Sequence, residues 1–352
     1  MSATVRYIRK RAFSPVVTGS LLYILTRGPE SLRRPLVNIL SSPANVERAK
    51  SVLKWLFALG LLGRLNSWLN SWAENGWQLY GDKKRWNWNK EIAVITGGSN
   101  GIGAGVVKGL AAKGIKCVVL DVEDLPKNMQ NYANINFYKC DITSPSAVSE
   151  VASEIRSKIG NPTILVNNAG IGTSHTILLT EPEYLERLFS INVFAHYNTL
   201  QAFLPSMISA NKGHVVTVAS LSSFVPPVGL VHYASTKAAV MSLHEGLTSE
   251  LRHLYNAPNV KTSIVHPTYA RTRLLEGFEK EVKENKGVVI DPKLISDAIV
   301  RQILSGRGAR VVVPQGMSLA KAIRGMPSWM QERLRDSLAP HTQSAKDMLL
   351  KR

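Results

Sequence analysis

The chain has 352 residues, 45% of them hydrophobic, so it can form one large domain with extensions and a substantial core. It carries 43 Lys and Arg against 25 Asp and Glu, a net charge of +18, and only two cysteines, Cys117 and Cys140, each in or at the end of an apolar run. Two such thiols argue against a disulfide-built secreted protein, and the uneven placement of the charge argues against a nucleic-acid-binding protein.

The first 90 residues form a basic extension rich in Trp and Leu. They hold 15 Lys and Arg against four acidic residues, which is most of the positive excess of the chain. Apolar runs at residues 16–25 and 52–65 are shorter than the roughly 18 to 20 residues that a spanning helix needs. Basic residues interleaved with Trp and Leu favour a helix lying in one leaflet of a membrane. The alternatives are a helix packed on the protein's own core and, because residues 1–29 contain no acid, a mitochondrial presequence.

After a polar linker at residues 81–90, short apolar runs alternate with helical segments. This alternation predicts an α/β fold with a doubly wound parallel sheet. We expect a sheet domain over residues 91–314, between the membrane-associating extension of residues 1–90 and an amphipathic extension at 315–352. Within the latter, residues 317–336 are either a second membrane-facing element or a packed helix. The predicted strands are residues 92–96, 116–120, 135–138, 163–166, 214–219, 260–265 and 309–313.

A glycine-rich turn follows the first predicted strand and precedes a helical stretch. Glycines there let the backbone approach a diphosphate, and the helix N-terminus supplies N–H groups and a positive dipole end. The strand, turn and helix in this order predict a dinucleotide site, although the spacing is GxxxGxG and not GxGxxG. The turn reads Thr96, Gly97, Gly98, Ser99, Asn100, Gly101, Ile102 and Gly103.

Two aspartates follow the next predicted strands. Asp121 ends the second strand, 18 residues after Gly103, where a carboxylate accepts hydrogen bonds from the adenosine ribose and repels a 2′-phosphate. Because no Lys or Arg stands in the glycine turn, NAD is favoured over NADP. Asp141, after the third strand, is either a ligand of the adenine amino group or a helix cap.

Tyr233 and Lys237 stand four residues apart in a predicted helix, so an ammonium lies beside a phenol on one helix face. A nearby cation favours the phenolate, and we therefore expect Lys237 to lower the pKa of Tyr233 and make it a general acid/base. Ser220 ends a buried predicted strand and can meet this helix face.

Together these motifs resemble the short-chain dehydrogenase/reductase family over residues 90–313. The resemblance implies a Rossmann-type, seven-stranded parallel sheet. It implies that Tyr233 exchanges the proton with the substrate oxygen, that Lys237 also holds the nicotinamide ribose, and that Ser220 hydrogen-bonds that oxygen. Asn192 would anchor a water for proton exit. The residues that carry the resemblance are the glycine turn, Asn167-Asn168-Ala169-Gly170, Asn192, Ser220, Tyr233 and Lys237.

The resemblance also implies the cofactor contacts, a homodimer through the helices following Tyr184 and His232, and a substrate lid at residues 269–286. No metal is expected. His266-Pro267-Thr268 departs from the Pro-Gly that the family usually has. The expected cofactor-binding residues are Gly97, Ser99, Asn100, Gly101, Ile102, Gly103, Asp121, Asp141, Ile142, Asn168, Ala169, Gly170, Tyr233, Lys237, Pro267 and Thr272.

The segment between Ser220 and Tyr233 is apolar, and it either lines the pocket or only packs a loop. If it lines the pocket, it indicates an apolar alcohol or ketone as the substrate. With the basic N-terminus, this segment makes the chain similar to the membrane- and lipid-droplet-associated retinol and hydroxysteroid dehydrogenases. We expect an NAD(P)-dependent enzyme, monotopic on the endoplasmic reticulum or a lipid droplet, that interconverts a lipophilic alcohol and its carbonyl. The alternatives are an NADPH-dependent keto-lipid reductase and a catalytically silent lipid-droplet scaffold. The apolar residues are Phe224, Val225, Pro226, Pro227, Val228 and Leu230.

Overall fold

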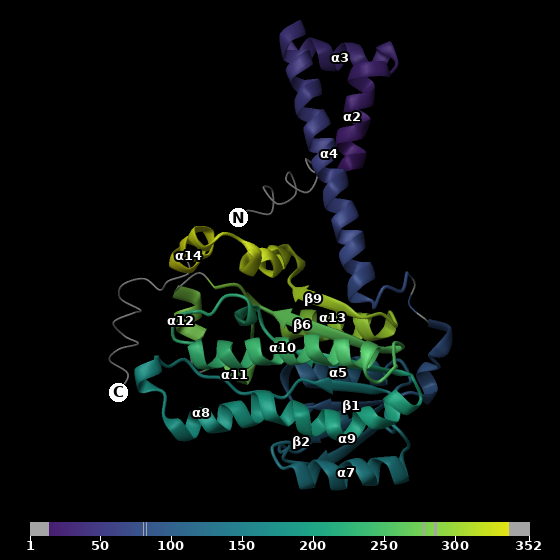
Figure 1. The fold of residues 1–352 in the computed structure, drawn as a ribbon, viewed down its shortest axis with the longest axis vertical. Coiled ribbons are helices and arrows are strands. Elements are labelled where there is room, and N and C mark those ends of the chain that lie inside the picture. Colours follow the sequence, from purple (N-terminus) through teal and green to yellow (C-terminus); the bar gives the residue numbers. More distant parts are fainter. Residues whose placement is uncertain (1–13, 80, 82, 277–278, 285–286, 338–352) are drawn as a thin grey trace. The chain divides into compact units, whose positions relative to one another are not determined.

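The computed structural model describes residues 14–79, 81, 83–276, 279–284 and 287–337 (Figure 1). The chain divides into two compact units, Met1–Ala73 and Glu74–Arg352. The basic residues at positions 6–11 and the end of the expected C-terminal extension, residues 338–352, lie outside the described residues. The domain limits expected at residues 90 and 314 stay predictions.

The first unit is a helical extension, as expected for the N-terminal part of the chain. It contains α2 (Pro15–Arg27), α3 (Glu30–Leu40) and α4 (Pro43–Glu74), whose last residue begins the second unit. Helices α2 and α4 pack against each other, because a Cβ atom at Gly19 would lie 2.9 Å from the ring of Phe57. Among the helices that the structure describes, none combines the length and the apolar character needed to cross a membrane.

The second unit contains the predicted seven-stranded parallel sheet, in the order β3-β2-β1-β4-β5-β6-β9. A short parallel pair, β7 (Tyr269–Ala270) and β8 (Val289–Ile290), lies outside it. Cys117 and Cys140 are buried and unpaired. The strands of the main sheet are β1 (Ile92–Thr96), β2 (Lys116–Asp121), β3 (Ile135–Lys139), β4 (Ile164–Asn167), β5 (Gly213–Val218), β6 (Val260–Pro267) and β9 (Ala309–Val313).

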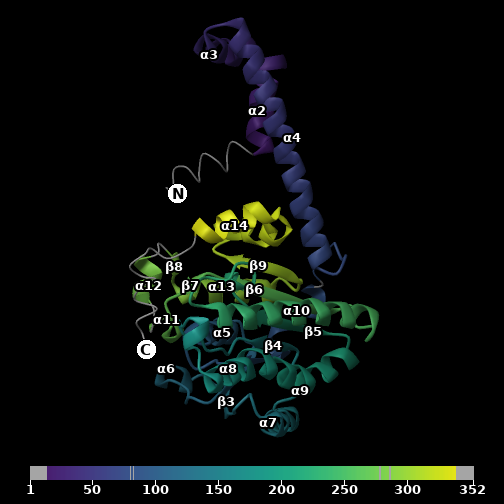
Figure 2. The same cartoon turned by 60° about the vertical axis from the view of Figure 1, so that its left-hand side comes forward.

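Both faces of the sheet are buried, which explains why its strands read as continuous apolar runs. In β1, Ala93 and Ile95 point into one core cluster, whereas Ile92 and Val94 point into the other. The first cluster is covered by α5 (Gly101–Ala111) and α13 (Pro292–Leu304). The opposite cluster is covered by α7 (Pro145–Lys158), α9 (Ala195–Ser209) and α10 (Val231–His253) (Figures 1 and 2).

The order of the sheet reverses between β1 and β4. In open parallel sheets of this kind, ligands bind in the crevice at the carboxyl ends of the strands, at this switch point. The connections before and between the strands supply the remaining elements. They are η1 (Lys83–Arg85), η2 (Trp88–Lys90), α6 (Lys127–Gln130), η3 (Ile177–Leu179), α8 (Pro182–Phe189), the π-helical turn η4 (Ser190–Phe194), η5 (Leu221–Ser223), α11 (Arg273–Glu276) and α12 (Glu279–Glu284).

The C-terminal segment forms η6 (Gln315–Gly325) and α14 (Ser328–Ser337). Ile323 of η6 is buried in a cluster with Phe224, so this segment packs on the core of its own domain. Leu319 and Trp329 of the same segment are exposed. The packed-helix alternative therefore describes one side of this segment, and a membrane-facing role for its other side stays a prediction.

Candidate active site

The glycine turn brings the backbone close to the N-terminus of α5. Gly97 and Gly101 have φ angles of +64° and +54°, which favour glycine. A Cβ atom at Gly103 would lie 2.1 Å from the Gly97 carbonyl oxygen, so a side chain has no room there. Asn100 caps α5, accepting a hydrogen bond from the Gly101 N–H at 2.9 Å. These residues fit a dinucleotide, because the turn is open to a diphosphate at a helix N-terminus.

Thr96 fastens this turn to the end of β4. Its Oγ1 atom accepts hydrogen bonds from the backbone N–H groups of Asn168 at 3.0 Å and Ala169 at 3.1 Å. The Asn168 Nδ2 atom donates to the carbonyl oxygens of Thr96 at 3.0 Å and Gly97 at 3.1 Å. Asn168 therefore fastens the end of β4 to the glycine turn. The role of Thr96 was missed, although its position directly before the glycines was a usable signal.

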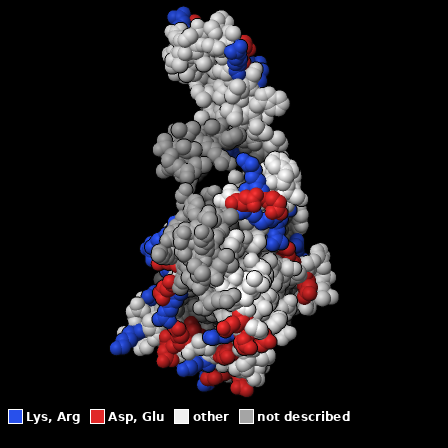
Figure 3. All heavy atoms as spheres, turned by 90° about the vertical axis from the view of Figure 1, so that its left-hand side faces the viewer, with Lys and Arg blue, Asp and Glu red and all other residues white. Residues whose placement is uncertain are grey.

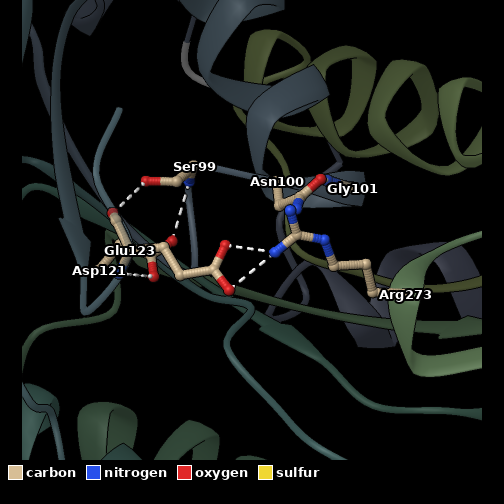
Figure 4. Close-up of polar contacts among 6 residues, drawn as sticks. All are labelled: Ser99, Asn100, Gly101, Asp121, Glu123 and Arg273. Carbon is tan, nitrogen blue, oxygen red and sulfur yellow. Dashed lines mark hydrogen bonds and ion pairs between the residues drawn. The ribbon is translucent and has the colours of Figure 1, made fainter. Parts of the chain in front are cut away.

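Asp121 lies at the carboxyl end of β2 beside the glycine turn (Figure 4). Its Oδ2 atom accepts a hydrogen bond from the Ser99 N–H at 2.9 Å, and its Oδ1 atom accepts one from the Glu123 N–H at 3.1 Å. The Ser99 hydroxyl donates to the Glu123 carbonyl oxygen at 2.9 Å. The structure thus brings Asp121 and the glycine turn together, and the ribose contact stays a prediction.

Asp141 and Ile142 lie after β3. The exposed Asp141 carboxylate accepts hydrogen bonds from the backbone N–H of Thr143 at 2.9 Å and its hydroxyl at 2.7 Å. It therefore shapes the turn that leads to Ser144, whose side chain caps α7, so the helix-cap alternative for Asp141 is wrong. Ile142 packs against the core cluster of α7 and α9. The adenine contact expected of Asp141 stays a prediction.

Ser220, Tyr233 and Lys237 line one pocket. Ser220 directly precedes η5, and the other two residues occupy successive turns of α10. The Ser220 side chain acts on the Tyr233 hydroxyl, and its Oγ atom donates to the Ser222 hydroxyl at 3.2 Å. The Lys237 Nζ atom donates to the Val218 carbonyl oxygen at 3.1 Å and lies 5.6 Å from the centroid of the Tyr233 ring. The strand end and the helix face therefore meet as the sequence predicts.

Burial shifts both ionisable groups of this pair toward their neutral forms. It raises the pKa of Tyr233 to about 12, against an opposing effect of the Ser220 side chain. It lowers the pKa of the Lys237 ammonium to about 8. The expected lowering of the Tyr233 pKa is therefore wrong for this arrangement, because loss of hydration outweighs the stabilisation of the phenolate. At neutral pH, Tyr233 is therefore a phenol, and Lys237 is an ammonium that gives up its proton more readily than an exposed lysine does.

Asn192 lies fully buried in the π-helical turn η4. Its side chain accepts a hydrogen bond from the Ile171 N–H and donates to the Ile171 carbonyl oxygen, both at 2.9 Å. It also donates to the Thr236 hydroxyl at 3.2 Å. A Cβ atom at Gly170 would lie 3.2 Å from Asn192 Oδ1 and 3.5 Å from Lys237 Nζ, so this network stands next to Lys237. The role of Asn192 in proton exit stays a prediction.

The pocket has a volume of about 360 Å³ and a mainly apolar lining. Four residues of the apolar segment before Tyr233 line it, whereas Phe224 packs on the ring of His266, with centroids 4.5 Å apart. Leu274 and Leu275 of α11 enclose the pocket from the expected lid. Of the expected cofactor contacts, Ile102, Asn168, Gly170, Pro267 and Thr272 also line it. The four wall residues are Val225, Pro227, Val228 and Leu230.

His266 supports Ser220 from behind the pocket. It is fully buried, and its Nδ1 atom lies 3.0 Å from the Ser220 carbonyl oxygen, which can only accept the hydrogen bond. The contact joins β6 to the end of β5. Sequence reasoning noted His266 only as a departure from the family pattern, because nothing local shows which backbone group it faces.

Comparisons with known proteins agree with this geometry. The family model described as short chain dehydrogenase matches residues 91–283. The chain belongs to the short-chain dehydrogenase family. Dehydrogenase RED2 of Cochliobolus heterostrophus is 39% identical to this short-chain dehydrogenase over 210 residues, which cover 60% of this chain and 78% of the relative. Estradiol 17-beta-dehydrogenase 11 of Homo sapiens is 32% identical over 234 residues, covering 65% and 76% of the two chains.

A solved structure, 3-ketoacyl-(acyl-carrier-protein) reductase from Brucella melitensis complexed with NADH, matches this short-chain dehydrogenase with a TM-score of 0.57. It is 26% identical, and the match covers 64% of this chain and 98% of that chain. The protein is thus an oxidoreductase that acts on CH–OH groups, with relatives among the hydroxysteroid dehydrogenases. The fold of the family binds NAD(P).

Proposed function

We propose that this short-chain dehydrogenase uses NAD to interconvert a lipophilic alcohol, such as a retinoid, a hydroxysteroid or a long-chain lipid alcohol, with its carbonyl. The observation that carries the proposal is the grouping of Ser220, Tyr233 and Lys237 in one pocket with a mainly apolar lining. A few convergent polar groups in an apolar pocket fix the orientation of a ligand whose body is hydrocarbon. Ser220 and Tyr233 would take the substrate oxygen, and Val225, Leu230 and Leu275 would contact the apolar body.

The chemistry follows from the protonation states of these residues. The bound dinucleotide supplies or accepts the hydride. In reduction, Tyr233 donates its proton to the carbonyl oxygen, which also accepts a hydrogen bond from Ser220; in oxidation, the Tyr233 phenolate takes the hydroxyl proton. Because the pKa of Tyr233 is raised to about 12, the phenol predominates at neutral pH and suits proton donation. Lys237, with a pKa of about 8, stands beside it to return protons.

NAD is the proposed cofactor because Asp121 lies at the end of β2 beside the glycine turn. A carboxylate there receives ribose hydroxyls and repels a 2′-phosphate. The Brucella melitensis reductase, which was solved as a complex with NADH, is compatible with this choice. We also propose a homodimer through α9 and α10, since Phe194, the last residue of η4, and Tyr197 of α9 are exposed by half or more of their surface.

Attachment to the endoplasmic reticulum membrane or a lipid droplet is proposed from the surface of the first unit. Helix α4 exposes large apolar side chains over several turns, among them Trp55 at 72%. On the face in Figure 3, this unit is mostly uncharged and its charged side chains gather near one end. An exposed, Trp-containing apolar surface of this kind is typical of surfaces that contact lipid or protein. The other exposed apolar residues are Val52, Leu59, Leu61, Leu62, Leu65, Trp68 and Leu69.

The test is turnover of the purified full-length protein with NAD and NADP against a panel of sterols, retinoids and long-chain alcohols. We expect turnover of lipophilic alcohols with NAD, and a loss of about 10²- to 10⁴-fold in Tyr233→Phe with NADH binding retained. Undiminished turnover in Tyr233→Phe would refute the assigned site. A preference for NADP would instead support the keto-lipid reductase. Lipid binding without turnover of any substrate in the panel would support the scaffold.

A further inference from the structure

Arg273 of α11, in the expected lid, and Glu123, after the carboxyl end of β2, form an ion pair. Glu123 follows β2, two residues after Asp121, and Arg273 begins α11, 150 residues later in the chain. The Arg273 Nη1 atom lies 2.8 Å from Glu123 Oε1 and 2.6 Å from Oε2 (Figure 4). Both carboxylate oxygens of Glu123 therefore face the guanidinium.

Contacts of the segments around Glu123 and around Arg273 determine the position of the ion pair. Glu123 is tied to the proposed ribose site, because its N–H donates to Asp121 and its carbonyl oxygen accepts from Ser99. On the lid side, Thr272 lies against the glycine turn, since a Cβ atom at Gly101 would lie 3.2 Å from its Cγ2 atom. The residues after Arg273 line the substrate pocket. The guanidinium is thus held at the edge of the crevice that would receive the adenosine half of a dinucleotide.

A guanidinium beside the adenosine ribose is the group that usually accommodates the 2′-phosphate of NADP. In this protein the Arg273 guanidinium is already paired with the Glu123 carboxylate. We infer that Glu123 is a second residue selecting NAD: it neutralises Arg273 and, with Asp121, leaves an excess of negative charge where a 2′-phosphate would lie. The inference rests on the proposed use of NAD and deepens it. This Arg comes from the lid, so inspection of the glycine turn alone cannot find it.

The simplest competing explanation is an ordinary surface ion pair. The side chains of Arg273 and Glu123 are 64% and 53% exposed, and such pairs contribute only about 0 to 1 kcal/mol to folding. Substitutions at either position should therefore leave the fold intact, which makes binding experiments interpretable. A surface pair, or a clamp that only holds the lid, would affect NADH and NADPH alike, whereas charge neutralisation predicts an effect on NADPH alone.

The experiment measures dissociation constants of NADH and NADPH by titration calorimetry on the full chain. The variants are Glu123→Gln, Arg273→Gln and the double variant. Glu154→Gln is the matched control, because Glu154 forms an exposed ion pair with Lys158 at 2.6 Å on α7 and carries the same charge. In Glu123→Gln we expect NADPH to bind about three- to tenfold more tightly, with NADH changed less than about twofold. The double variant should lose this gain, and Glu154→Gln should show none.

Each outcome decides a different point. A gain for both dinucleotides, a gain that persists in the double variant, or an equal gain in Glu154→Gln would overturn the role of Glu123. A wild-type preference for NADH that Glu123→Gln leaves unchanged would overturn this inference and leave the proposed NAD preference standing. A wild-type preference for NADPH would overturn the proposed NAD preference and this inference together.

Discussion

His266 holds the backbone of Ser220 through a hydrogen bond of 3.0 Å between its Nδ1 atom and the Ser220 carbonyl oxygen. Burial lowers the pKa of His266 to about 4, so the imidazole is neutral over the whole range in which the enzyme would be assayed. The bond is therefore made by a neutral donor and does not switch with pH near neutrality. On the other side, the His266 ring packs on Phe224. We conclude that His266 positions the serine of the proposed site.

Replacing His266 tests this positioning. His266→Ala removes the donor to Ser220 and leaves a cavity beside Phe224, so we expect a loss of about 2 to 4 kcal/mol in unfolding free energy and a lower kcat. His266→Asn keeps an N–H donor and should recover part of the kcat. Turnover per folded molecule, KM for NAD and urea unfolding are the measurements. Equal destabilisation in both variants with an unchanged kcat would show that His266 only fills space.

Lys237 is expected to lower the stability of the fold while serving catalysis. Its folded pKa of about 8 lies below the ordinary 10.5, so the unfolded chain binds more protons between these values and stability rises with pH there. The loss of stability caused by burying the Lys237 ammonium is complete below pH 8 and disappears above about pH 10.5. We expect Lys237→Met to abolish turnover and to raise the unfolding free energy at pH 7 by about 1 to 3 kcal/mol.

The increase in unfolding free energy of Lys237→Met should be smaller than the pKa shift alone implies. The reason is that the Val218 carbonyl oxygen loses its hydrogen-bond donor in this variant. Urea unfolding at pH 7 and pH 9.5 measures it, and the advantage of Lys237→Met should shrink at the higher pH. A variant that is less stable than the wild type at pH 7 would mean that the lysine contributes packing or hydrogen bonding worth more than its desolvation costs.

The fold and the local motifs were predictable because their determinants are close in sequence. Parallel strands buried on both faces read as apolar runs, and all seven main strands were predicted with ends within two residues of those observed. The four-residue spacing of Tyr233 and Lys237 likewise predicts a shared helix face. Both predictions needed only patterns of residues that are close to one another in the sequence.

The remaining parts of the site depend on contacts between distant segments. Glu123 meets Arg273 across 150 residues, and His266 meets Ser220 across 46. The direction of the Tyr233 pKa shift could not be predicted from the sequence either, because it depends on how completely the pocket walls bury the phenol. A cation four residues away is visible in the sequence, whereas the loss of hydration is set by the packed fold.

Three buried histidines predict a steep loss of stability in acid. Burial lowers the pKa of each to about 3 from an ordinary 6.5, so stability is complete above pH 6.5 and falls as the pH drops toward 3. With His266, whose pKa is lowered to about 4, four extra protons taken up on unfolding correspond to a slope of about 5 kcal/mol per pH unit. Urea unfolding between pH 7 and 5 measures this slope. The residues are His196, His214 and His244.

A single substitution measures how much one buried histidine contributes to the slope of unfolding free energy against pH. His214 lies 2.9 Å from the Ser263 hydroxyl, and His214→Gln keeps a polar partner for it without a group that titrates in this range. We expect the variant to lose about one quarter of the slope between pH 6 and 5. An unchanged slope would mean that other groups, such as carboxylates, control acid unfolding.

The last prediction concerns lipid binding by α4. Trp55, Leu59 and Leu62 follow the spacing of one helix face and are 52% to 72% exposed. We expect the full-length triple variant Trp55→Gln, Leu59→Gln, Leu62→Gln to bind vesicles of phosphatidylcholine and phosphatidylserine at least about tenfold less tightly in a flotation assay, because burial of apolar surface drives such binding.

A matched control replaces three exposed apolar residues of the second unit with Gln: Val122, Leu178 and Leu254. Flotation should persist in this control if α4 carries the lipid contact, and an equal loss in both variants would indicate non-specific apolar binding. Turnover of a water-soluble alcohol should remain normal in the α4 variant, since Ser220, Tyr233 and Lys237 all belong to the other unit. Normal turnover with lost flotation separates lipid attachment from catalysis, whereas persistent flotation of the α4 variant would remove the support for attachment through this face.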